Sequence, residues 1–406
     1  MTQRRRSNPP TWYAILLLIL ALLLFLYRRG FFGPAPTQAP TPVTGQPTKP
    51  PATAATTAPA NTATSAPSQA TNAPTSAAPA TWYELYFTTP QYPDKPEYHH
   101  GSLDEHLVAF INTALKTIDL ADYDFDLENV ATALAQAAQR GVRVRMVTDT
   151  DTLTNEKNDE VQKAFGILKK AKIPIVDDQR GPIMHNKFLV VDNAAVWTGS
   201  WNFTDGDTYH LNNNAIKIMS PELAQNYSAE FEKMFVQRTF GPNKTPGVPH
   251  PVLTINGVHV ENYFAAEDHV ANHIVDHLKQ AQQSIHFLAF SFTSTVIGDV
   301  VRERAKAGVK VAGVFETTGS ETKFSEYGRM KQAGLDVLQD GNPYVMHHKV
   351  FIVDGRKVIF GSFNFSNNAD KDNDENLLIV DDPQIAAAFE AEFQRVRAVA
   401  LHPPKK

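Results

Sequence analysis

The stretch His185-Asn-Lys187-Phe-Leu-Val-Val-Asp192, followed by Gly199-Ser200-Trp-Asn202, occurs twice in this chain with the same internal gaps. The second copy reads His347-His-Lys349-Val-Phe-Ile-Val-Asp354 and is followed by Gly361-Ser362-Phe-Asn364. Residues two positions apart on an extended strand point to the same face, so the histidine and the lysine of each copy project together. One such pair is easily a surface coincidence. A duplicated pair with every gap preserved indicates one site built from two halves.

The residues that precede each copy repeat as well. Thr-Ile-Asp-Leu-Ala from Thr117 aligns with Ser-Ile-His-Phe-Leu from Ser284 at an offset of 167 residues, and Gly-Val-Arg-Val from Gly141 aligns with Gly-Val-Lys-Val from Gly308 at the same offset. Apolar spacing predicts strands at 83–87, 117–123, 142–147, 258–264, 284–290 and 309–315, and helices at 103–115, 127–139, 270–280 and 296–305. Both glycines stand where a helix should end and the next strand begin.

Strands that alternate with helices in two successive series predict an α/β fold. We expect two pseudo-symmetric α/β sandwich halves, each with a mixed β-sheet and with helices outside, at residues 81–246 and 247–406. The chain of 406 residues, 42% of them hydrophobic, is long enough for two such cores.

The residue types of the motif favour binding of a phosphate anion. Lys187 and Lys349 each place a positive charge beside an imidazole, which attracts an anion and repels a metal cation, so zinc binding by the histidines is disfavoured and no metal or cofactor is expected. Two histidines that face each other across the halves can divide the cleavage of a phosphodiester, one attacking phosphorus and one protonating the leaving oxygen. Neutral groups suited to the non-bridging phosphate oxygens come from Ser200, Asn202, Ser362 and Asn364.

Asp192 and Asp354 each end an apolar strand. An acidic residue at such a position is often a turn former. Because both copies keep it, we expect the two aspartates to support the site through an ion pair rather than to react themselves.

Together these residues resemble the signature of the phospholipase D superfamily, His-x-Lys-x4-Asp-x6-Gly-Ser-x-Asn, and the resemblance extends from Trp82 to about Val399. It implies two halves about a pseudo-two-fold axis, a phosphohistidine on one histidine, a general acid on the other, and release by water or an alcohol without metal. It implies catalytic roles for His185, Lys187, Asp192, His347, Lys349 and Asp354, and phosphate binding by Ser200, Asn202, Ser362 and Asn364.

The resemblance also draws attention to an asymmetry downstream of the motifs. Members of this superfamily commonly carry a glutamate there that holds a catalytic imidazole through its second nitrogen, and Glu375 fits this position in the second copy. The first copy has Asn213 instead, which cannot stabilise an imidazolium by charge. We therefore predict that Glu375 stands behind His347 and favours its protonated form, and that His185, in the N-terminal copy, is the nucleophile.

The N-terminal part has a different composition. Residues 12–27 are an uncharged apolar run of 16 residues between arginines, which as a helix would be about 24 Å long. We predict that residues 1–30 are an uncleaved membrane anchor, the alternative being a cleaved signal peptide and a secreted protein. Residues 31–80, rich in Pro, Thr, Ala and Ser, are expected to be a disordered linker that holds an extracytoplasmic catalytic part away from the membrane.

The distribution of charge bears on the substrate. The first 80 residues hold six basic and no acidic residues, which leaves 32 basic against 43 acidic residues in the rest, a net charge near −11. Such a charge disfavours general attraction to a polyanion. The chain contains no cysteine, which excludes disulfides, thiolate metal sites and a cysteine nucleophile.

We therefore expect a membrane-anchored, metal-independent phosphodiesterase that hydrolyses phospholipids to phosphatidic acid and a free head group, and that acts as a monomer. Three alternatives stay open: a nuclease that cleaves DNA or RNA, a phosphatidyltransferase of the cardiolipin synthase kind, and a non-catalytic phosphate-binding scaffold. A scaffold would have no need to keep both histidines, both lysines and both asparagines at fixed spacing. The motifs do not separate lipid from nucleic acid, because both substrates are phosphodiesters.

Overall fold

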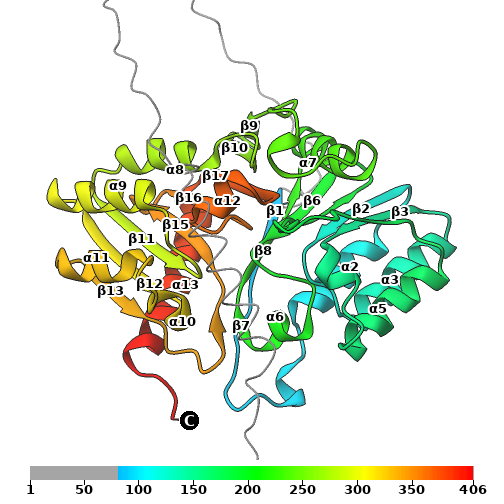
Figure 1. The fold of residues 1–406 in the computed structure, drawn as a ribbon, viewed down its shortest axis with the longest axis horizontal. Coiled ribbons are helices and arrows are strands. Elements are labelled where there is room, and N and C mark those ends of the chain that lie inside the picture. The colour runs from blue at the N-terminus through cyan, green and yellow to red at the C-terminus, as the bar shows by residue number, and fades with distance from the viewer. Residues whose placement is uncertain (1–80, 406) are drawn as a thin grey trace, which may run out of the picture. The chain divides into compact units, whose positions relative to one another are not determined.

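The structure, a computed structural model, describes residues 81–405, which form two β-sheets with helices around them (Figure 1). The predicted anchor at 1–30 and linker at 31–80 lie outside the described residues. Within 81–405, no helix combines the length and the apolar composition needed to cross a membrane.

The first sheet has seven strands in the order β1-β8-β6-β5-β2-β3-β4. Neighbours among β2, β3 and β4 run parallel and are joined by crossover helices, whereas the other pairs are antiparallel. The strands are β1 Tyr83–Phe87, β2 Thr117–Asp122, β3 Arg143–Thr148, β4 Ile175–Asp177, β5 Lys187–Val191, β6 Ala195–Gly199 and β8 Asn214–Met219. The helices are α2 Leu103–Asn112, α3 Glu128–Gln139, α4 Thr150–Leu153, α5 Asp159–Lys170, α6 Asp205–Tyr209 and α7 Pro221–Phe235, with short 3-10 helices η1 Pro96–Tyr98 and η2 Gly241–Asn243.

The second sheet has eight strands in the order β13-β12-β11-β15-β16-β17-β10-β9. It repeats the order and the strand directions of the first sheet and adds β9 at one edge. The strands are β9 Val252–Ile255, β10 Val258–Ala265, β11 Ser284–Ala289, β12 Lys310–Phe315, β13 Asp336–Gln339, β15 Lys349–Val353, β16 Lys357–Gly361 and β17 Glu375–Asp381. The helices are α8 Val270–Lys279, α9 Thr295–Lys306, α10 Thr317–Ser320, α11 Glu326–Gln332, α12 Asn367–Lys371 and α13 Pro383–Leu401.

The mixed α/β architecture predicted from the apolar pattern is confirmed, and each predicted strand and helix is present with ends shifted by at most three residues. Gly141 and Gly308 have φ angles of 93° and 95° where α3 and α9 give way to strands, a backbone conformation that glycine adopts without strain. Two further short strands, β7 Leu211–Asn212 and β14 Val345–Met346, pair in parallel with each other and so join the two halves.

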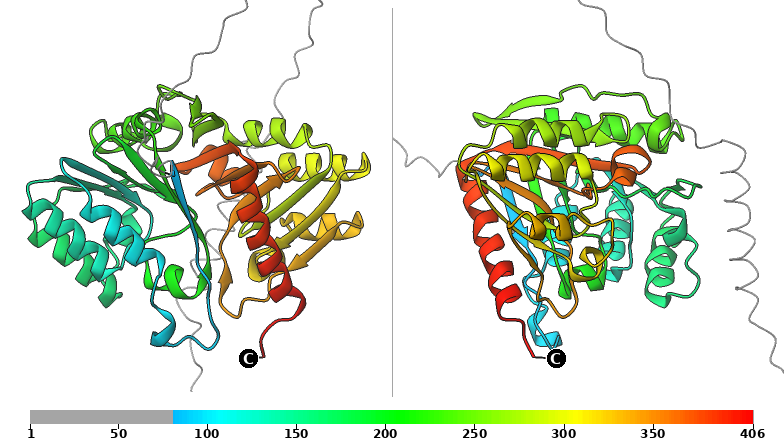
Figure 2. Two further views of the ribbon diagram at one scale, coloured as in Figure 1. Left: turned by 180° about the vertical axis from the view of Figure 1, so that it is seen from behind. Right: turned by 60° about the vertical axis from the view of Figure 1, so that its left-hand side comes forward.

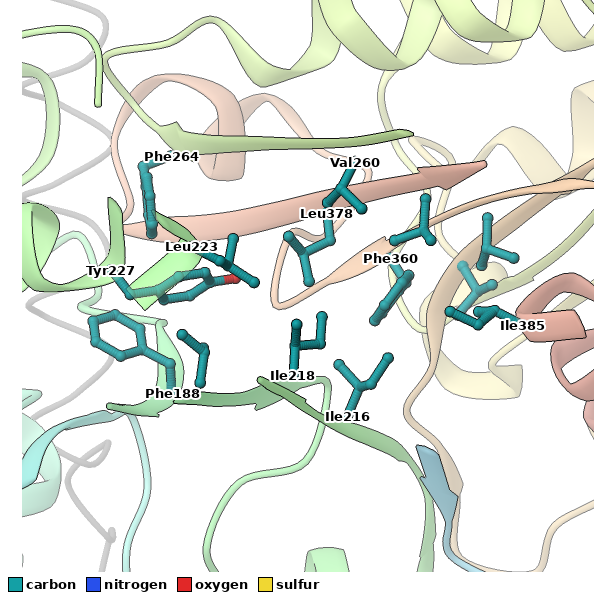
Figure 3. Close-up of a cluster of buried hydrophobic side chains, with 14 of the residues drawn as sticks. Phe188, Ile216, Ile218, Leu223, Tyr227, Val260, Phe264, Phe360, Leu378 and Ile385 are labelled. Carbon is teal, nitrogen blue, oxygen red and sulfur yellow. The ribbon is translucent and has the colours of Figure 1, made fainter. Parts of the chain in front are cut away.

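The motif strands β5 and β15 are buried along their whole length. Because successive side chains point to opposite faces, Phe188 and Val190 enter a central core, whereas Leu189 and Val191 enter the outer core of the first half. β15 divides its side chains between the central core and the outer core of the second half in the same way. The central core draws apolar side chains from both sheets (Figure 3).

Two helices correct the expectation that all helices lie outside the sheets. α2, α3 and α5 cover the outer face of the first sheet, and α8, α9 and α11 cover that of the second. α7 and α13 instead contribute side chains to the central core between the sheets, and α13 runs along this junction (Figure 2). Both begin in the same way, with a capping Ser220 or Asp382 followed directly by proline.

Candidate active site

Each motif begins on a segment that pairs with the opposite half. The backbone N–H of His185 donates to the carbonyl oxygen of Asp374 at 2.9 Å, and the N–H of His347 donates to that of Asn212 at 3.0 Å. These hydrogen bonds are reciprocal, since Asp374 and Asn212 precede β17 and β8 by one and two residues in corresponding places of the two copies. The residue that follows Asp374 or Asn212 is thereby placed beside the histidine of the other copy.

His185 is held by the second half. Its side chain is almost completely buried, with the residue 4% exposed, and its Nδ1 lies 2.7 Å from Oε2 of Glu375. The hydroxyl of Ser362 donates to the same carboxylate oxygen at 2.7 Å, and the amide of Asn373 donates to Oε1 at 3.3 Å. The prediction that Glu375 stands behind His347 is therefore wrong. The backbone hydrogen bond between His185 and Asp374 places the next residue, Glu375, beside the histidine of the first half.

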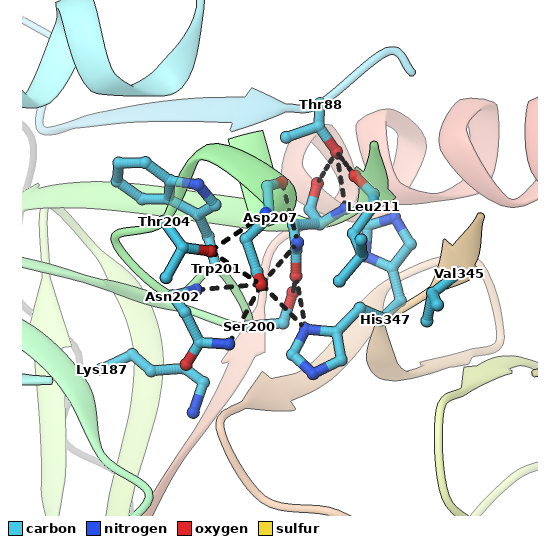
Figure 4. A network of polar contacts seen from close by, with 12 residues as sticks. Thr88, Lys187, Ser200, Trp201, Asn202, Thr204, Asp207, Leu211, Val345 and His347 are labelled. Atoms are coloured by element: carbon cyan, nitrogen blue, oxygen red, sulfur yellow. Dashed lines mark hydrogen bonds and ion pairs between the residues drawn. The ribbon is translucent and has the colours of Figure 1, made fainter. Parts of the chain in front are cut away.

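His347 is held by the first half and has two partners. The residue is 6% exposed, and its Nδ1 lies 2.9 Å from Oδ1 of Asn213 and 3.2 Å from Oδ1 of Asp207. The hydroxyl of Ser200 donates to the same oxygen of Asn213 at 2.8 Å. Asn213 thus occupies the place that Glu375 has in the other copy, and a carboxylate from α6 stands beside it (Figure 4).

The expected phosphate-binding role of Ser200 and Ser362 is not supported by their positions. Both side chains are fully buried, and both hydroxyls donate to the side chain that holds an imidazole, Asn213 or Glu375. A hydroxyl used in this way orients the partner of the histidine and is not directed at substrate. The Gly-Ser part of the motif is therefore structural.

The glycine before each serine has a related reason. A Cβ at Gly199 would overlap the backbone oxygen of Asn214, and a Cβ at Gly361 would overlap that of Asn376. Only glycine allows β6 and β16 to approach the next strand this closely. That approach places the following serine within hydrogen-bonding reach of Asn213 or Glu375.

Lys187 and Lys349 are both 0% exposed. Each Nζ donates to the carbonyl oxygen of the histidine two residues before it, at 2.8 Å for Lys187 and 2.7 Å for Lys349. Burial lowers the pKa of Lys187 and lowers that of Lys349 well below its usual value, and for Lys349 the charge of Lys187 adds to the effect. Two buried ammonium groups that disfavour each other's charge form a site in which an anion is strongly preferred.

An aromatic side chain accompanies each pair. The Tyr123 ring lies 5.1 Å from the His185 ring and 5.2 Å from Nζ of Lys187. Phe290 holds the equivalent place in the second half, with its ring 4.6 Å from the His347 ring and 4.6 Å from the Nζ of the adjacent lysine. These two residues directly follow the strands β2 and β11 and place apolar ring surface beside the imidazoles.

Burial and the charges of the two lysines lower the pKa of both imidazoles. Burial lowers the pKa of His185 well below its usual value, and the charges of Lys187 and Lys349 lower it further. Burial and then the charge of Lys349 lower the pKa of His347 to about 3. Burial and the two lysines therefore disfavour protonation of both imidazoles in the unliganded protein. A bound phosphodiester anion opposes the field of the lysines and raises both pKa values.

The carboxyl groups behind the imidazoles differ strongly. Burial raises the pKa of Glu375 to about 8, although the charge of Lys187 acts in the opposite direction. Burial also acts to raise the pKa of Asp207, but the charge of His347 when it is protonated, the hydrogen bond with His347 and the N–H groups of Asn202 lower it to about 2. At pH 7, His347 faces a fixed negative charge, whereas His185 faces a carboxyl group that readily takes up a proton.

Asn202 and Asn364 end the two motifs at the same place in each half. The side-chain Nδ2 of Asn202 donates to Asp207 at 3.1 Å. The side-chain oxygens of Asn202 and Asn364 are both buried and have no hydrogen-bond partner. An amide oxygen and a phosphate oxygen both accept hydrogen bonds, so these unpartnered atoms do not bear on the expected phosphate-binding role, which would use the Nδ2 N–H groups.

Asp192 and Asp354 do not belong to the site. Asp192 follows β5, about 16 Å along the strand from Lys187, and accepts the backbone N–H groups of residues 115, 116 and 117. Asp354 accepts those of residues 282, 283 and 284 in the same way. The expected ion pair and the implied catalytic role are therefore wrong. Both aspartates secure the turn before β2 or β11.

Asp207 is the functional candidate that the sequence analysis missed. Its signal was present, since Thr204-x-x-Asp207 aligns with Ser366-x-x-Ala369, and Thr204 and Ser366 cap α6 and α12 alike. A charged residue in one copy opposite alanine in the other marks a position where the two copies have diverged. Among residues 81–405, no group of three or more His, Asp or Glu side chains has an arrangement that could hold a metal ion.

Comparison with known proteins agrees with this geometry. The family model described as "Cardiolipin synthase, PLD-like domain" matches residues 107–235 and 274–397, one match in each half. A phospholipase D of Rickettsia typhi is 30% identical over 173 residues, which cover 42% of this chain and 85% of that protein. A mitochondrial cardiolipin hydrolase of Chlamydomonas reinhardtii is 34% identical over 122 residues, which cover 30% of this chain and 55% of that protein.

Among solved structures, that of phosphatidylserine synthase from Haemophilus influenzae Rd KW20 has a TM-score of 0.58 and 14% identity, and the match covers 78% of this chain and 86% of the other. This similarity concerns the fold alone. The family match in both halves and the identity to the Rickettsia protein establish that the chain belongs to the phospholipase D-like superfamily of phosphodiesterases.

Proposed function

We propose that this protein is a metal-independent phospholipase D, which hydrolyses a phospholipid to phosphatidic acid and a free head group. One observation carries the proposal: two buried imidazoles, one from each half, are each held through Nδ1 beside two buried lysines. Holding Nδ1 leaves Nε2 of each ring as the nitrogen that can act on substrate.

In the proposed first step, the lone pair on Nε2 of His185 attacks phosphorus, and the bond between phosphorus and the head-group oxygen breaks. His347 donates its Nε2 proton to that oxygen, so the head group leaves as an alcohol. In the second step, a water molecule transfers a proton to His347 and attacks phosphorus. The phosphorus–nitrogen bond then breaks, His185 recovers its electron pair, and phosphatidic acid is released.

The choice of His185 as nucleophile rests on the two carboxyl groups. His347 faces Asp207, whose pKa of about 2 keeps it ionised and able to stabilise an imidazolium. His185 faces Glu375, whose pKa is raised to about 8. When Glu375 is ionised it accepts the Nδ1 proton of His185, which fixes the tautomer with a free lone pair on Nε2. The assignment made from the sequence is kept, but for a different reason.

Substrate binding falls to the lysines and asparagines. Lys187 and Lys349 neutralise the phosphodiester, and Asn202 and Asn364 contact its non-bridging oxygens. As charge develops in the trigonal-bipyramidal transition state, preorganised groups of this kind stabilise it at little reorganisation cost.

Two features favour a phospholipid over a nucleic acid. The relatives described above are named phospholipase D and cardiolipin hydrolase. The apolar run at 12–27 is proposed to hold the enzyme at a bilayer, with its catalytic part outside the cytoplasm.

The test compares substrates for the same full-length protein. The chain is incubated in EDTA with vesicles of phosphatidylcholine, phosphatidylglycerol or cardiolipin and, separately, with single-stranded DNA; His185→Ala is the matched control. We expect phosphatidic acid from at least one lipid, no cleavage of DNA, and no product with the control. Cleavage of DNA alone would establish a nuclease, and binding of lipid without turnover would favour the scaffold.

A second arm separates hydrolysis from transfer. Glycerol or phosphatidylglycerol is added as an acceptor, and the products are identified by mass spectrometry. We expect phosphatidic acid to remain the main product. A transfer product that replaces it would instead indicate a phosphatidyltransferase.

A further inference from the structure

The two copies differ at the residue that holds the imidazole of the opposite half. Glu375 and Asn213 each lie 13 residues after the serine that donates to them. A glutamate in one copy is thus replaced by an amide in the other. If nothing else changed, His347 would lack the carboxyl group that lies beside His185.

A carboxyl group is found six residues before Asn213, on α6. Asp207 occupies the position that corresponds to Ala369 on α12, as the equivalent caps Thr204 and Ser366 show. The short helix therefore carries a carboxylate in the copy that lacks one at 213, and carries alanine in the copy that has one at 375. The two substitutions complement each other.

The geometry of Asp207 suits it for a fixed charge. The residue is 7% exposed, and its Oδ1 receives Nδ2 of Asn213 at 3.0 Å, Nδ2 of Asn202 at 3.1 Å and the backbone N–H of Asn202 at 3.2 Å, while Nδ1 of His347 lies at 3.2 Å. Oδ2 accepts from the hydroxyl of Thr204 at 3.2 Å. Figure 4 shows these contacts converging on Asp207.

His347 needs such a charge because of its other neighbours. Lys349 and Lys187 both act against its protonation, and so does burial. The remaining neighbours, Asn213 and the ring of Phe290, carry no charge. A buried imidazolium between two ammonium groups is costly unless an anion lies beside it.

We propose that Asp207 is a positioning residue for His347, and that it supplies from α6 the carboxyl group that His185 receives from the second half through Glu375. The proposal rests on the proposed function, in which His347 is the general acid. Asp207 does not touch the substrate. It acts by stabilising the imidazolium and by orienting Asn213 and Asn202.

The first experiment removes the charge and keeps the shape. Asp207→Asn is expected to lower kcat by about 10²-fold while KM changes little, and to move the alkaline limb of the rate profile to lower pH, because His347 then loses its proton more easily. Asp205→Asn is the matched control, since Asp205 is an exposed residue on the same helix. The control is expected to keep the parent rate and profile.

The second experiment moves the charge to the place it has in the other copy. Asp207→Ala alone is expected to be at least as impaired as Asp207→Asn. Adding Asn213→Glu recreates the pair formed by Ala369 and Glu375 and is expected to recover at least 10-fold of the lost rate. A role confined to the folding of the α6 loop predicts no such rescue, because Ala at 207 removes every contact of that side chain.

A third measurement does not depend on turnover. NMR titration of ¹⁵N-labelled histidine, with inorganic phosphate bound, reports the pKa of His347 in the parent and in Asp207→Asn. We expect the pKa to fall by about 1–3 units in the variant, as for removal of an adjacent opposite charge. An unchanged pKa and an unchanged rate profile would overturn the proposal. Absence of phosphodiesterase activity in the parent would instead defeat the proposed function, and the titration would still decide the role of Asp207.

Discussion

The two halves of this protein share a backbone plan but differ in how they hold an imidazole. In each, a buried serine donates to a side chain that crosses the junction to Nδ1 of the opposite histidine. For His185 that side chain is Glu375, with a pKa raised to about 8, and for His347 it is Asn213 with the ionised Asp207 beside it. Both imidazoles experience the charges of the same two lysines.

The difference indicates which parts of a duplicated site can diverge. The histidines, lysines and asparagines, which in the proposed mechanism bind the same phosphodiester, are identical in both copies. The groups behind Nδ1 meet only the imidazole, so a carboxylate can change its position in the chain provided that its charge stays close to the ring. Asymmetry of function between symmetric histidines can therefore arise outside the motif.

The largest expected effect follows from loss of either histidine. His185→Ala and His347→Ala are each expected to lower turnover by about 10⁴-fold or more, and the double variant is expected to be no worse than either single one, because the two rings act on one phosphodiester. The melting temperature should be nearly unchanged. A double variant far slower than both single variants would show that the halves work as independent sites.

The same comparison assigns the covalent step. Rapid quenching at alkaline pH, where phosphohistidine is stable, followed by peptide mass spectrometry, is expected to find the phosphoryl group on His185. An adduct on His347 would reverse the two roles. In that case the histidine beside the ionised Asp207 would be the nucleophile, and the one beside Glu375 the acid.

A smaller effect is expected from Glu375→Gln. The ionised form of Glu375 is needed to accept the Nδ1 proton of His185, and with a pKa of about 8 this form is present above that pH and lost as the pH falls through it. The rate of phosphohistidine formation should therefore rise with pH through about 8. The variant is expected to be about 10²-fold slower and to lose this acidic limb, while the alkaline limb set by His347 stays. Loss of the alkaline limb instead would place Glu375 behind the acid.

The sequence alone predicted much of the fold but not the connections of the site. Elements such as β2 and α9 follow from local apolar spacing, which is why their ends were predicted within one residue. The pairing of Glu375 with His185 depends on a hydrogen bond between His185 and Asp374, 189 residues apart in the chain, and no local pattern encodes it. Glu375 is much closer to His347 than to His185 in the sequence, which is why His347 was predicted as its partner. In the structure each half instead holds the histidine of the other half.

Asp192 failed as a prediction for a similar reason. Its φ angle of 53° lets the chain turn after β5, and its carboxylate then meets N–H groups about 75 residues earlier. The presence of an aspartate in both copies led to the expectation of an ion pair at the site. The aspartate is instead explained by a turn that occurs in both sheets. The prediction that the two His-x-Lys pairs lie close together is confirmed. The catalytic roles of these four residues stay predictions.

The aspartates give a fourth prediction, which concerns stability rather than rate. Asp192→Ala and Asp354→Ala each remove an acceptor for three backbone N–H groups at a partly exposed turn. By analogy with loss of a helix cap, each is expected to lower the free energy of unfolding by about 1 kcal/mol. The turnover number should stay within about twofold of the parent, measured well below the melting temperature. A large loss of turnover without loss of stability would return these residues to the active site.

The smallest expected effect is that of a chelator, for which we predict no change in turnover. In the proposed mechanism the nucleophile and the acid are imidazoles and the phosphate is neutralised by Lys187 and Lys349, so every charge that the transition state requires comes from a side chain.

The difference between the halves indicates where a metal could bind. Asp122, Asp124 and Asp207 belong to the first half, where the second half has Ala289, Ser291 and Ala369, and the second half contributes Glu375. All four carboxyl groups lie within electrostatic reach of Lys187, so a metal bound to them would be repelled by its ammonium group. Loss of turnover in EDTA that a divalent metal restores would contradict the mechanism and would direct attention to those three aspartates. Unchanged turnover in both the parent and Asp124→Asn would support a site in which the first-half carboxylates, Asp207 apart, shape the field around Lys187 without taking part in the reaction.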